Sequence, residues 1–413
     1  MSGRVKVLTV ENESLKAEVE IYRHEAAAAT TAQGNSSHNN DDDDNNDIEA
    51  SDASDLFVRA GQGVYSNTNE ITWKNAHGSS NNLCVALSRD EMVVASGGAD
   101  NALRLVFSAT ESMEGTSARL ELSAPVISVA FGQDRSIKNV LACGCMDGSS
   151  YLVQYAVENE GGRSVLKIIN HMALPNKQNK YVKNVAWNPK EAVLATASTD
   201  GTVHLYRVQQ EGLDSLTLAP KYGVTLAESL HLQTAIEALT FTNDDQLLCF
   251  ARNTPHIAAF DLNKDMAQTK INLNKAGTTT VGGFDEHVSM AVMDLQVSAA
   301  HGCWLAATDT ARNFVLDART SSKTKIVRNL YGHANDGYSQ PKAVWSSNGQ
   351  YVLGNTQDES VVCVWDVASQ KLVEKLSGHG APIRDLDSSP MSDMVVTTAF
   401  DKTTRLWYPS SQS

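Results

Sequence analysis

Residues 378–408 read GHGAPIRDLDSSPMSDMVVTTAFDKTTRLWY. This stretch holds a Gly-His pair, an apolar strand, a polar turn, a second strand, a turn with Asp401 and a third strand ending at Trp407. Asp401 and Trp407 are six residues apart. The same step joins Asp100 to Val106, Asp147 to Val153, Asp200 to Tyr206, Asn253 to Ala259 and Asp309 to Val315, and a step of seven joins Asp358 to Trp365.

The turns recur at intervals of 43 to 56 residues. Each interval has room for four short strands rich in Val, Leu, Ala and Cys, separated by turns that often carry Gly or Asn. Repeats of about 40 to 50 residues are typical of propellers and solenoids. The sequence therefore predicts an all-β, seven-bladed β-propeller at residues 64–408, followed by a tail at 409–413.

The order of strands also predicts how the ring closes. If each repeat begins with the outer strand of the preceding blade, the first such strand, at 70–73, has no earlier blade to join. We expect it to pair with the strand at 405–407, which removes two open sheet edges.

The motifs resemble those of the WD-repeat family, in which Gly-His precedes and Trp-Asp closes each unit. Gly-His stands at 332–333 and 378–379, and Trp-Asp at 365–366. The resemblance covers about residues 64–408. Degenerate Gly-His pairs are assigned to Ala76-His77, Asn170-His171, Leu230-His231 and Glu286-His287, with Ser123-Ala124 in the second unit.

The resemblance implies a structural role for these residues. In the last blade it implies a buried hydrogen-bonded chain of His379, Thr397 or Thr398, Asp401 and Trp407. It assigns structural roles to His333, Asp358 and Trp365 in the sixth. A motif repeated around a ring is a requirement of the fold, and common nucleophile, phosphate-binding, zinc-protease and dinucleotide motifs are absent. We therefore predict no catalytic residue, cofactor or metal.

The resemblance instead implies a scaffold that assembles a multiprotein complex through the loop-bearing face of the ring. Loops lengthened at 172–181, 275–291 and 334–341 should lie on this face. Aromatic residues, Met and Arg are favoured at interfaces. The predicted protein-binding residues are Met146, Lys183, Arg252, Tyr338, Arg384 and Phe400. For Met146 and Phe400 the alternative is packing between blades.

A second functional hypothesis concerns residues 304–319. They resemble the Trp-Asp-x-Arg box of WD-repeat substrate receptors for cullin-RING ubiquitin ligases, with Leu316 in place of Trp. In that reading Asp317 and Arg319 would contact the ligase adaptor.

The N-terminal region is predicted to differ from the ring. Residues 5–29 favour a helix, and heptad spacing at 5–22, with Asn12 in the seam, is compatible with a short parallel homodimer. A solitary helix, a helix that docks on another protein, and the remnant of a longer coiled coil are the alternatives. Residues 30–60 are predicted to be a disordered acidic linker because they are polar and charged.

Composition narrows the function classes further. The net charge is −14, of which residues 1–55 carry −9, with 13 acidic and 4 basic side chains, so the ring is only mildly acidic. This argues against nucleic acid as a direct ligand, which needs clustered Lys and Arg. No apolar run is long enough for a membrane span, and six cysteines within strand patterns suggest reduced, buried thiols. We expect other proteins as partners and a cytoplasmic or nuclear location.

Overall fold

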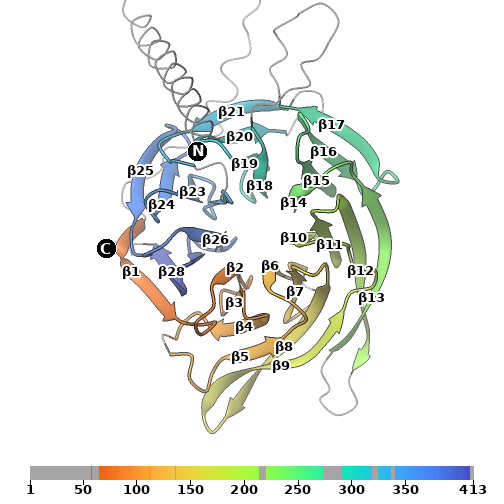
Figure 1. The fold of residues 1–413 in the computed structure, drawn as a ribbon, viewed down its shortest axis with the longest axis vertical. Helices are drawn as coiled ribbons and strands as arrows, with labels where there is room; N and C mark the ends of the chain where they lie inside the picture. Colours follow the sequence, from red (N-terminus) through yellow and green to blue (C-terminus); the bar gives the residue numbers. More distant parts are fainter. Residues whose placement is uncertain are drawn as a thin grey trace, which may run out of the picture. The chain divides into compact units, whose positions relative to one another are not determined.

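The computed structural model describes Phe57 and residues 65–110, 112–134, 136–213, 220–273, 290–318, 324–335 and 340–409. In these ranges, 28 strands form seven four-stranded antiparallel sheets arranged as the blades of a ring (Figure 1). The predicted seven-bladed propeller is confirmed. The predicted helix at 5–29, the heptads at 5–22 and nearly all of the linker at 30–60 lie outside the described residues.

Each blade runs from an inner strand at the central channel to an outer strand at the rim. Blade 1 contains β2 (Asn82–Leu87), β3 (Val93–Gly98), β4 (Ala102–Phe107) and β5 (Ala118–Glu121). Blade 2 contains β6 (Val126–Phe131), β7 (Val140–Cys145), β8 (Ser150–Glu160) and β9 (Arg163–Ala173). Blade 3 contains β10 (Val182–Trp187), β11 (Val193–Ser198), β12 (Thr202–Leu213) and β13 (Pro220–His231).

The remaining four blades follow the same order. Blade 4 contains β14 (Ile236–Phe241), β15 (Gln246–Ala251), β16 (His256–Asp261) and β17 (Ala267–Asn272). Blade 5 contains β18 (Val292–Val297), β19 (Trp304–Thr308), β20 (Asn313–Asp317) and β21 (Lys325–Leu330). Blade 6 contains β22 (Ala343–Trp345), β23 (Tyr351–Asn355), β24 (Val362–Asp366) and β25 (Lys371–Leu376). Blade 7 contains β26 (Ile383–Ser388), β27 (Val395–Ala399), β28 (Thr403–Pro409) and, as its outer strand, β1 (Tyr65–Lys74).

The clasp between the two ends of the ring is the one that the sequence predicts. In β1, Ile71 lies opposite Leu406 of β28, and Trp73 lies opposite Thr404. The indole of Trp73 is buried with apolar side chains of blades 1 and 7, and its Nε1 donates a hydrogen bond to the carbonyl of Thr110 in blade 1 (2.7 Å). One strand therefore completes blade 7 and also joins it to blade 1.

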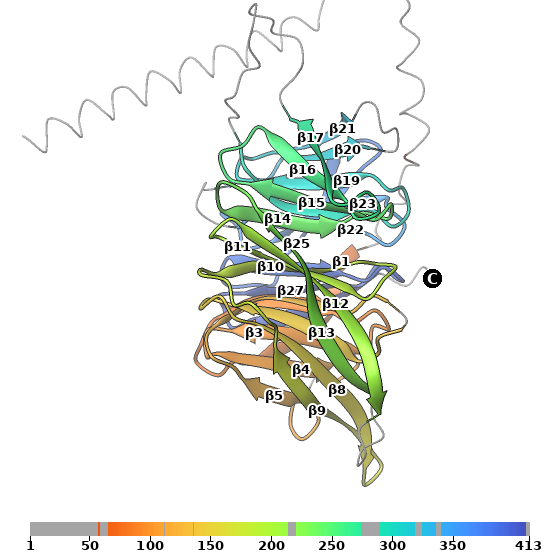
Figure 2. The ribbon, with the colours of Figure 1, turned by 90° about the vertical axis from the view of Figure 1, so that its right-hand side faces the viewer.

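Two neighbouring blades have outer hairpins that extend beyond the rest of the ring. The β8–β9 and β12–β13 pairs are built of strands of 11 and 12 residues, and Figure 2 shows their ends projecting. Each hairpin packs on the blade before it: the backbone N–H of Leu166 donates to Thr116 (3.1 Å), and the hydroxyl of Tyr222 accepts from the N–H of Lys138 (3.1 Å). Both side chains are buried, so the hairpins brace the ring from outside.

Phe57 is fixed although it falls within the linker predicted at 30–60. Its ring is 6% exposed and lies in the apolar core between blades 5 and 6. The imidazole of His301 meets it edge-on at a centroid distance of 5.4 Å, and the Arg328 guanidinium lies 4.8 Å from its centroid. Arg328 is oriented by donating Nε to the carbonyl of Val367 (3.1 Å). The chain is therefore anchored at Phe57, ahead of the clasp.

The buried chain predicted for blade 7 is present. His379 Nδ1 lies 3.1 Å from Asp401 Oδ2, His379 Nε2 lies 2.8 Å from Thr397 Oγ1, and Trp407 Nε1 donates to the same hydroxyl (3.0 Å). Burial opposes ionisation of Asp401, but hydrogen bonds from His379 and Thr403 hold the pKa of its carboxyl well below the usual range. Thr397, not Thr398, is the hydroxyl of the chain.

Blade 1 keeps most of this chain without the Gly or the Trp. His77 Nδ1 lies 2.8 Å from Asp100 Oδ1, and His77 Nε2 lies 3.0 Å from Ser96 Oγ. The assignment of Ala76-His77 to the Gly-His position is therefore confirmed. Val106 occupies the place of the Trp.

Blades 3 and 4 overturn two of the degenerate assignments. His171 and His231 are exposed residues of the outer strands β9 and β13. In blade 3 the buried amide of Gln178 takes the place of the imidazole, accepting from Thr196 Oγ1 (3.1 Å) and donating to Thr202 Oγ1 (2.8 Å). An amide can do this because it carries both a donor and an acceptor. His287 lies outside the described residues.

Blade 6 departs from the chain implied by its Gly-His and Trp-Asp motifs. Asp358 is exposed and accepts from Thr356 Oγ1 (2.5 Å), while Trp365 Nε1 donates to the carbonyl of Tyr331 (2.7 Å). The seven-residue step, with Ser360 at a positive φ of 55°, displaces the carboxylate. His333 packs edge-on against Trp365, and neither ring nitrogen has a hydrogen-bond partner among the described residues.

The clasp predicts that Trp73→Ala destabilises the ring. The substitution removes a nearly fully buried indole and its hydrogen bond at the joint between blades 7 and 1, which should lower the free energy of unfolding by about 3–5 kcal/mol. The control is Lys74→Ala, because Lys74 is exposed in the same strand. Urea denaturation of both variants provides the measurement. Equal losses for the two variants would contradict the clasp.

The pKa of His333 predicts a loss of stability in mild acid. Burial lowers this pKa to about 4, whereas an unfolded histidine titrates near 6.5. The unfolded chain therefore binds the extra proton first, and this residue should reduce the free energy of unfolding by about 2 kcal/mol between pH 7 and pH 5. Because other groups also titrate, the measurement is the difference between this pH slope in the wild type and in His333→Gln. Identical slopes would show that His333 is not the cause.

Candidate protein-binding site at the channel mouth

The channel mouth is the end of the central channel at which the inner strands begin. A β-bulge is repeated there from blade to blade. In six of the seven inner strands that the structure describes, the register with the next strand shifts after the first pair. Such a bulge re-aims the skipped side chain. The skipped residues, here called the bulge residues, are Leu83, Ile127, Lys183, Glu237, Met293 and Arg384.

The turns that carry the repeat Asp or Asn lie beside these bulges. In five blades, the residue before that Asp or Asn donates its backbone N–H to a carbonyl just ahead of the inner strand. These donors are Ala99, Met146, Thr199, Arg252 and Phe400. These turns are therefore held next to the starts of the inner strands.

Lys183 and Arg252, both predicted as binding residues, meet at a carboxylate that the sequence analysis did not select. Arg252 Nε donates to Glu237 Oε1 (2.5 Å), and Lys183 Nζ pairs with Glu237 Oε2. Burial would raise the pKa of Glu237, but the two cations lower it, so the carboxylate is ionised. Arg252 also approaches Met293 Sδ (3.9 Å) and keeps about half of its side chain exposed.

Arg384 and Phe400 form a second pair on blade 7. The guanidinium carbon of Arg384 lies 6.0 Å from the centroid of the Phe400 ring, and Phe400 is 39% exposed. Burial lowers the pKa of Arg384. Within the part of the chain that the structure describes, its guanidinium makes no hydrogen bond or ion pair. The alternative of Phe400 as a residue packed between blades is not what the structure shows, because two fifths of the side chain faces solvent.

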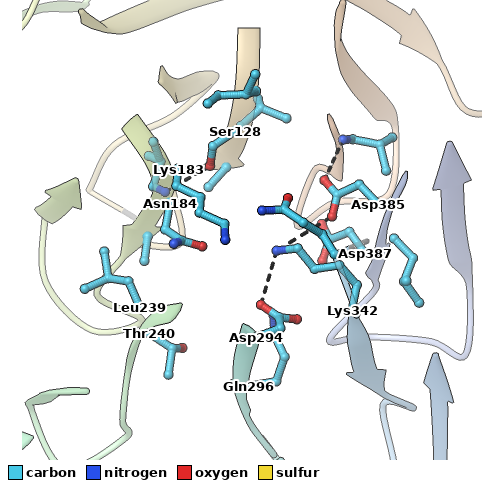
Figure 3. Close-up of a pocket in the computed structure, with 18 of the residues that line it drawn as sticks. Ser128, Lys183, Asn184, Leu239, Thr240, Asp294, Gln296, Lys342, Asp385 and Asp387 are labelled. Carbon is cyan, nitrogen blue, oxygen red and sulfur yellow. Dashed lines mark hydrogen bonds and ion pairs between the residues drawn. The ribbon is translucent and has the colours of Figure 1, made fainter. Parts of the chain in front are cut away.

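The central channel holds a cavity of about 190 Å³, lined by charged and polar side chains together with apolar ones such as Leu83 and Ile127. Lys342 Nζ lies between Asp294 Oδ1 (3.2 Å) and Asp385 Oδ1 (3.8 Å), and Figure 3 shows it reaching into the cavity from the side opposite Lys183. Burial raises the pKa of Asp387 to about 6. Asp385 and Asp387 each accept a backbone N–H of β2, from Val85 and Leu87 (both 2.9 Å).

The other predicted binding residues stand as follows. Met146 is half-buried at the turn of blade 2. Tyr338 and Arg319 lie outside the described residues. Asp317 ends β20 opposite Lys325, and Leu316 is buried opposite Trp304. Without Arg319, the ligase-adaptor contact stays a prediction.

The sequence contained a signal for the bulge residues, of which Leu83, Ile127, Glu237 and Met293 were not selected in the sequence analysis. Lys183 and Arg384 each stand 17 residues before the turn Asp of their blade, as does Leu83. Glu237 and Met293 stand 16 residues before theirs. Counting back from each turn would have found five of the six. Ile127 would have been missed, because a longer turn places it 20 residues before Asp147.

The described parts of the chain contain no group of three or more His, Cys, Asp or Glu side chains arranged to hold a metal ion. All six cysteines are buried and free. No helix in the described ranges is long and apolar enough to cross a membrane.

Comparison with known proteins identifies the repeat. Residues 168–207 and 370–408 match the family model described as WD domain, G-beta repeat. Each matched segment runs from an outer strand through the first three strands of the next blade, which is the phase of the repeat predicted from the sequence.

The relatives match over short stretches. The chain is 36% identical over 61 residues to Periodic tryptophan protein 2 homolog of Mus musculus, which covers 15% of this chain and 7% of that protein. It is 33% identical over 60 residues to Periodic tryptophan protein 2 of Arabidopsis thaliana, covering 14% and 7%. It is 33% identical over 58 residues to the U5 small nuclear ribonucleoprotein 40 kDa protein of Pongo abelii, covering 14% and 16%. The likeness thus spans a small part of each relative.

Seven blades, the His–Ser/Thr–Asp chains in blades 1 and 7, and a family match in two of the repeats lead to one conclusion. The chain is a seven-bladed β-propeller in which two of the repeats match the WD domain, G-beta repeat family.

Proposed function

We propose that this protein is a non-enzymatic scaffold that binds partner proteins at the channel mouth. WD40 propellers are commonly protein-interaction scaffolds and typically lack catalysis. The observation that carries the proposal is the combination of exposed Phe400 and Arg252 with the bulge residues around them. Aromatic and Arg side chains are the types that most often dominate binding energy.

The rigidity of the mouth supports this use. Arg252 is held by the Glu237 carboxylate. The turns that carry Arg252 and Phe400 are each hydrogen-bonded to the residue just ahead of an inner strand. Side chains that are already ordered lose little conformational freedom on binding, so more of the contact energy becomes affinity.

The assembly in which the protein works, its location in the cell and its oligomeric state are also matters of proposal. One relative is named as a protein of a small nuclear ribonucleoprotein, which supports a place in a multiprotein assembly and a nuclear location, while a cytoplasmic location stays a prediction. Dimerisation through residues 5–22 stays a prediction. Reception of ubiquitin-ligase substrates through Asp317 and Arg319 has no structural observation in its favour and is not proposed.

The mouth is tested by quantitative cross-linking and affinity capture with the full chain. We expect Arg252→Ala and Phe400→Ala to lose the same set of partners by about tenfold or more, as for residues that contribute over 1.4 kcal/mol to binding. Thermal unfolding checks that both variants are folded, because Arg252 also pairs with the buried Glu237 carboxylate and Phe400 is only 39% exposed.

The matched controls are Arg163→Ala, in the outer hairpin of blade 2, and Met391→Ala, in the β26–β27 turn at the opposite end of β26 from the mouth. Arg163 is exposed, and Met391 is 68% exposed. An unchanged set of partners in both mouth variants, or an equal loss in the controls, would place the binding surface elsewhere.

A further inference from the structure

The charges at the channel mouth do not balance. Three of the residues at the mouth are cations, Lys183, Arg252 and Arg384, whereas one, Glu237, is a carboxylate. Each oxygen of Glu237 already holds one of the first two cations. Within the described ranges Arg384 forms no ion pair within 4 Å. The Asp385 carboxylate attracts it electrostatically, but Asp385 is shared with Lys342 and with the N–H of Val85.

The other acids near the mouth are already engaged. Asp147 pairs with Lys177 (2.9 Å), Asp401 pairs with His379, and Asp309 accepts the backbone N–H of Ala291 (2.7 Å). Deeper in the channel, Asp385 accepts the N–H of Val85 and lies beside Lys342. None of these groups forms an ion pair with the Arg384 guanidinium within 4 Å.

The surroundings of Arg384 favour a carboxylate. A guanidinium has five N–H donors and no acceptor, and it fits a carboxylate in a two-pronged pair. Arg384 lines the channel cavity, where a partly buried and unpaired cation is unfavourable. A carboxylate supplied by a ligand would remove this cost, so the site should discriminate strongly for charge.

Apolar surface adjoins the cation. Phe400 lies beside Arg384, and Leu83 and Ile127 line the same cavity from blades 1 and 2. All three are at least partly accessible. An apolar or aromatic side chain next to the carboxylate would have an anchoring surface here.

The size of the cavity limits the ligand. At about 190 Å³ it is smaller than the roughly 300–1,000 Å³ typical of pockets for drug-sized molecules. It has room for one or two side chains and not for a folded element. The mouth is therefore suited to an extended peptide segment that inserts a side chain.

Resting on the proposed function, we propose that the channel mouth binds an acidic peptide segment of a partner protein. An Asp or Glu carboxylate of the segment pairs with Arg384, and a neighbouring apolar side chain packs against Phe400, Leu83 and Ile127. A basic segment is disfavoured, because Asp385 and Asp387 are committed to the backbone of blade 1 and Lys342 already occupies the space between Asp294 and Asp385.

The proposal is tested with the full chain and four pools of random 12-residue peptides that differ only at two central positions. These positions are Glu-Phe, Gln-Phe, Lys-Phe or phosphoserine-Phe. We expect the Glu-Phe pool to be captured about thirtyfold more than the Gln-Phe pool, as for a buried charge pair worth 2 kcal/mol or more. We expect the Lys-Phe pool to be captured least.

Two variants distinguish recognition of the peptide carboxylate from packing of its apolar side chain. Arg384→Gln should abolish the preference for Glu-Phe over Gln-Phe, while the control Arg163→Gln keeps it. Phe400→Ala should weaken capture of the Glu-Phe and Gln-Phe pools alike and leave their ratio unchanged. Thermal unfolding checks that each variant is folded, and Phe400→Ala still tests the proposal if Arg384→Gln fails to fold.

Several outcomes would overturn the proposal. They are equal capture of all pools, capture of none, preference for Lys-Phe, or preference for phosphoserine-Phe over Glu-Phe, which would mean that the site reads phosphate. If these occur while Arg252→Ala and Phe400→Ala still lose partners, the scaffold at the mouth stands and only the acidic specificity fails. If partners are also unchanged, the proposed function fails as well.

Discussion

A closed ring of sheets must satisfy polar groups at every joint between neighbouring inner strands. Here one position of the inner strand meets this need repeatedly: Ser128 accepts the N–H of Val185, and Asn184 donates to the carbonyl of Glu237 (both 3.0 Å). The same position holds Asp385 in blade 7, which accepts from Val85 across a separation of 300 residues. The last joint therefore forms only when the two ends of the domain have met. The clasp strand β1 and the Asp385 carboxylate together close this joint between blades 7 and 1. The closed ring of the other blades depends on this joint.

Spacing in the sequence was sufficient for the number of blades, the order of strands and the clasp, because each follows from strand length and turn position. The hydrogen-bonded chain inside each blade was harder to predict. It depends on the position of a polar side chain in the folded blade, and a residue type alone does not determine that position. Gln178 replaces a histidine in blade 3, and His171, seven residues earlier, is an exposed strand residue. In blade 6 the familiar residues are all present, but one additional residue moves Asp358 away from His333.

The candidate site was predicted in part for a similar reason. Lys183, Arg252, Arg384 and Phe400 were selected by their positions in the repeat, through the family resemblance, and all four lie at the channel mouth. Glu237 was not selected, because an acidic residue is depleted in interfaces and its role is to hold two cations in place. Its burial follows from the bulge of β14, which no single-residue property reveals. The lack of an ion pair for Arg384 likewise depends on the hydrogen bonds and ion pairs that the neighbouring Asp side chains already form.

Phe57 gives the ring two distinct sides. Its contact with His301 lies in the β18–β19 turn, at the end of β18 opposite the bulge of Met293 at the mouth. An inner strand of six residues is about 20 Å long. A protein bound at the mouth would therefore lie about one inner-strand length from Phe57, at the other end of the channel. The length of the inner strands would then set the distance between that protein and the point where this chain is anchored to the ring.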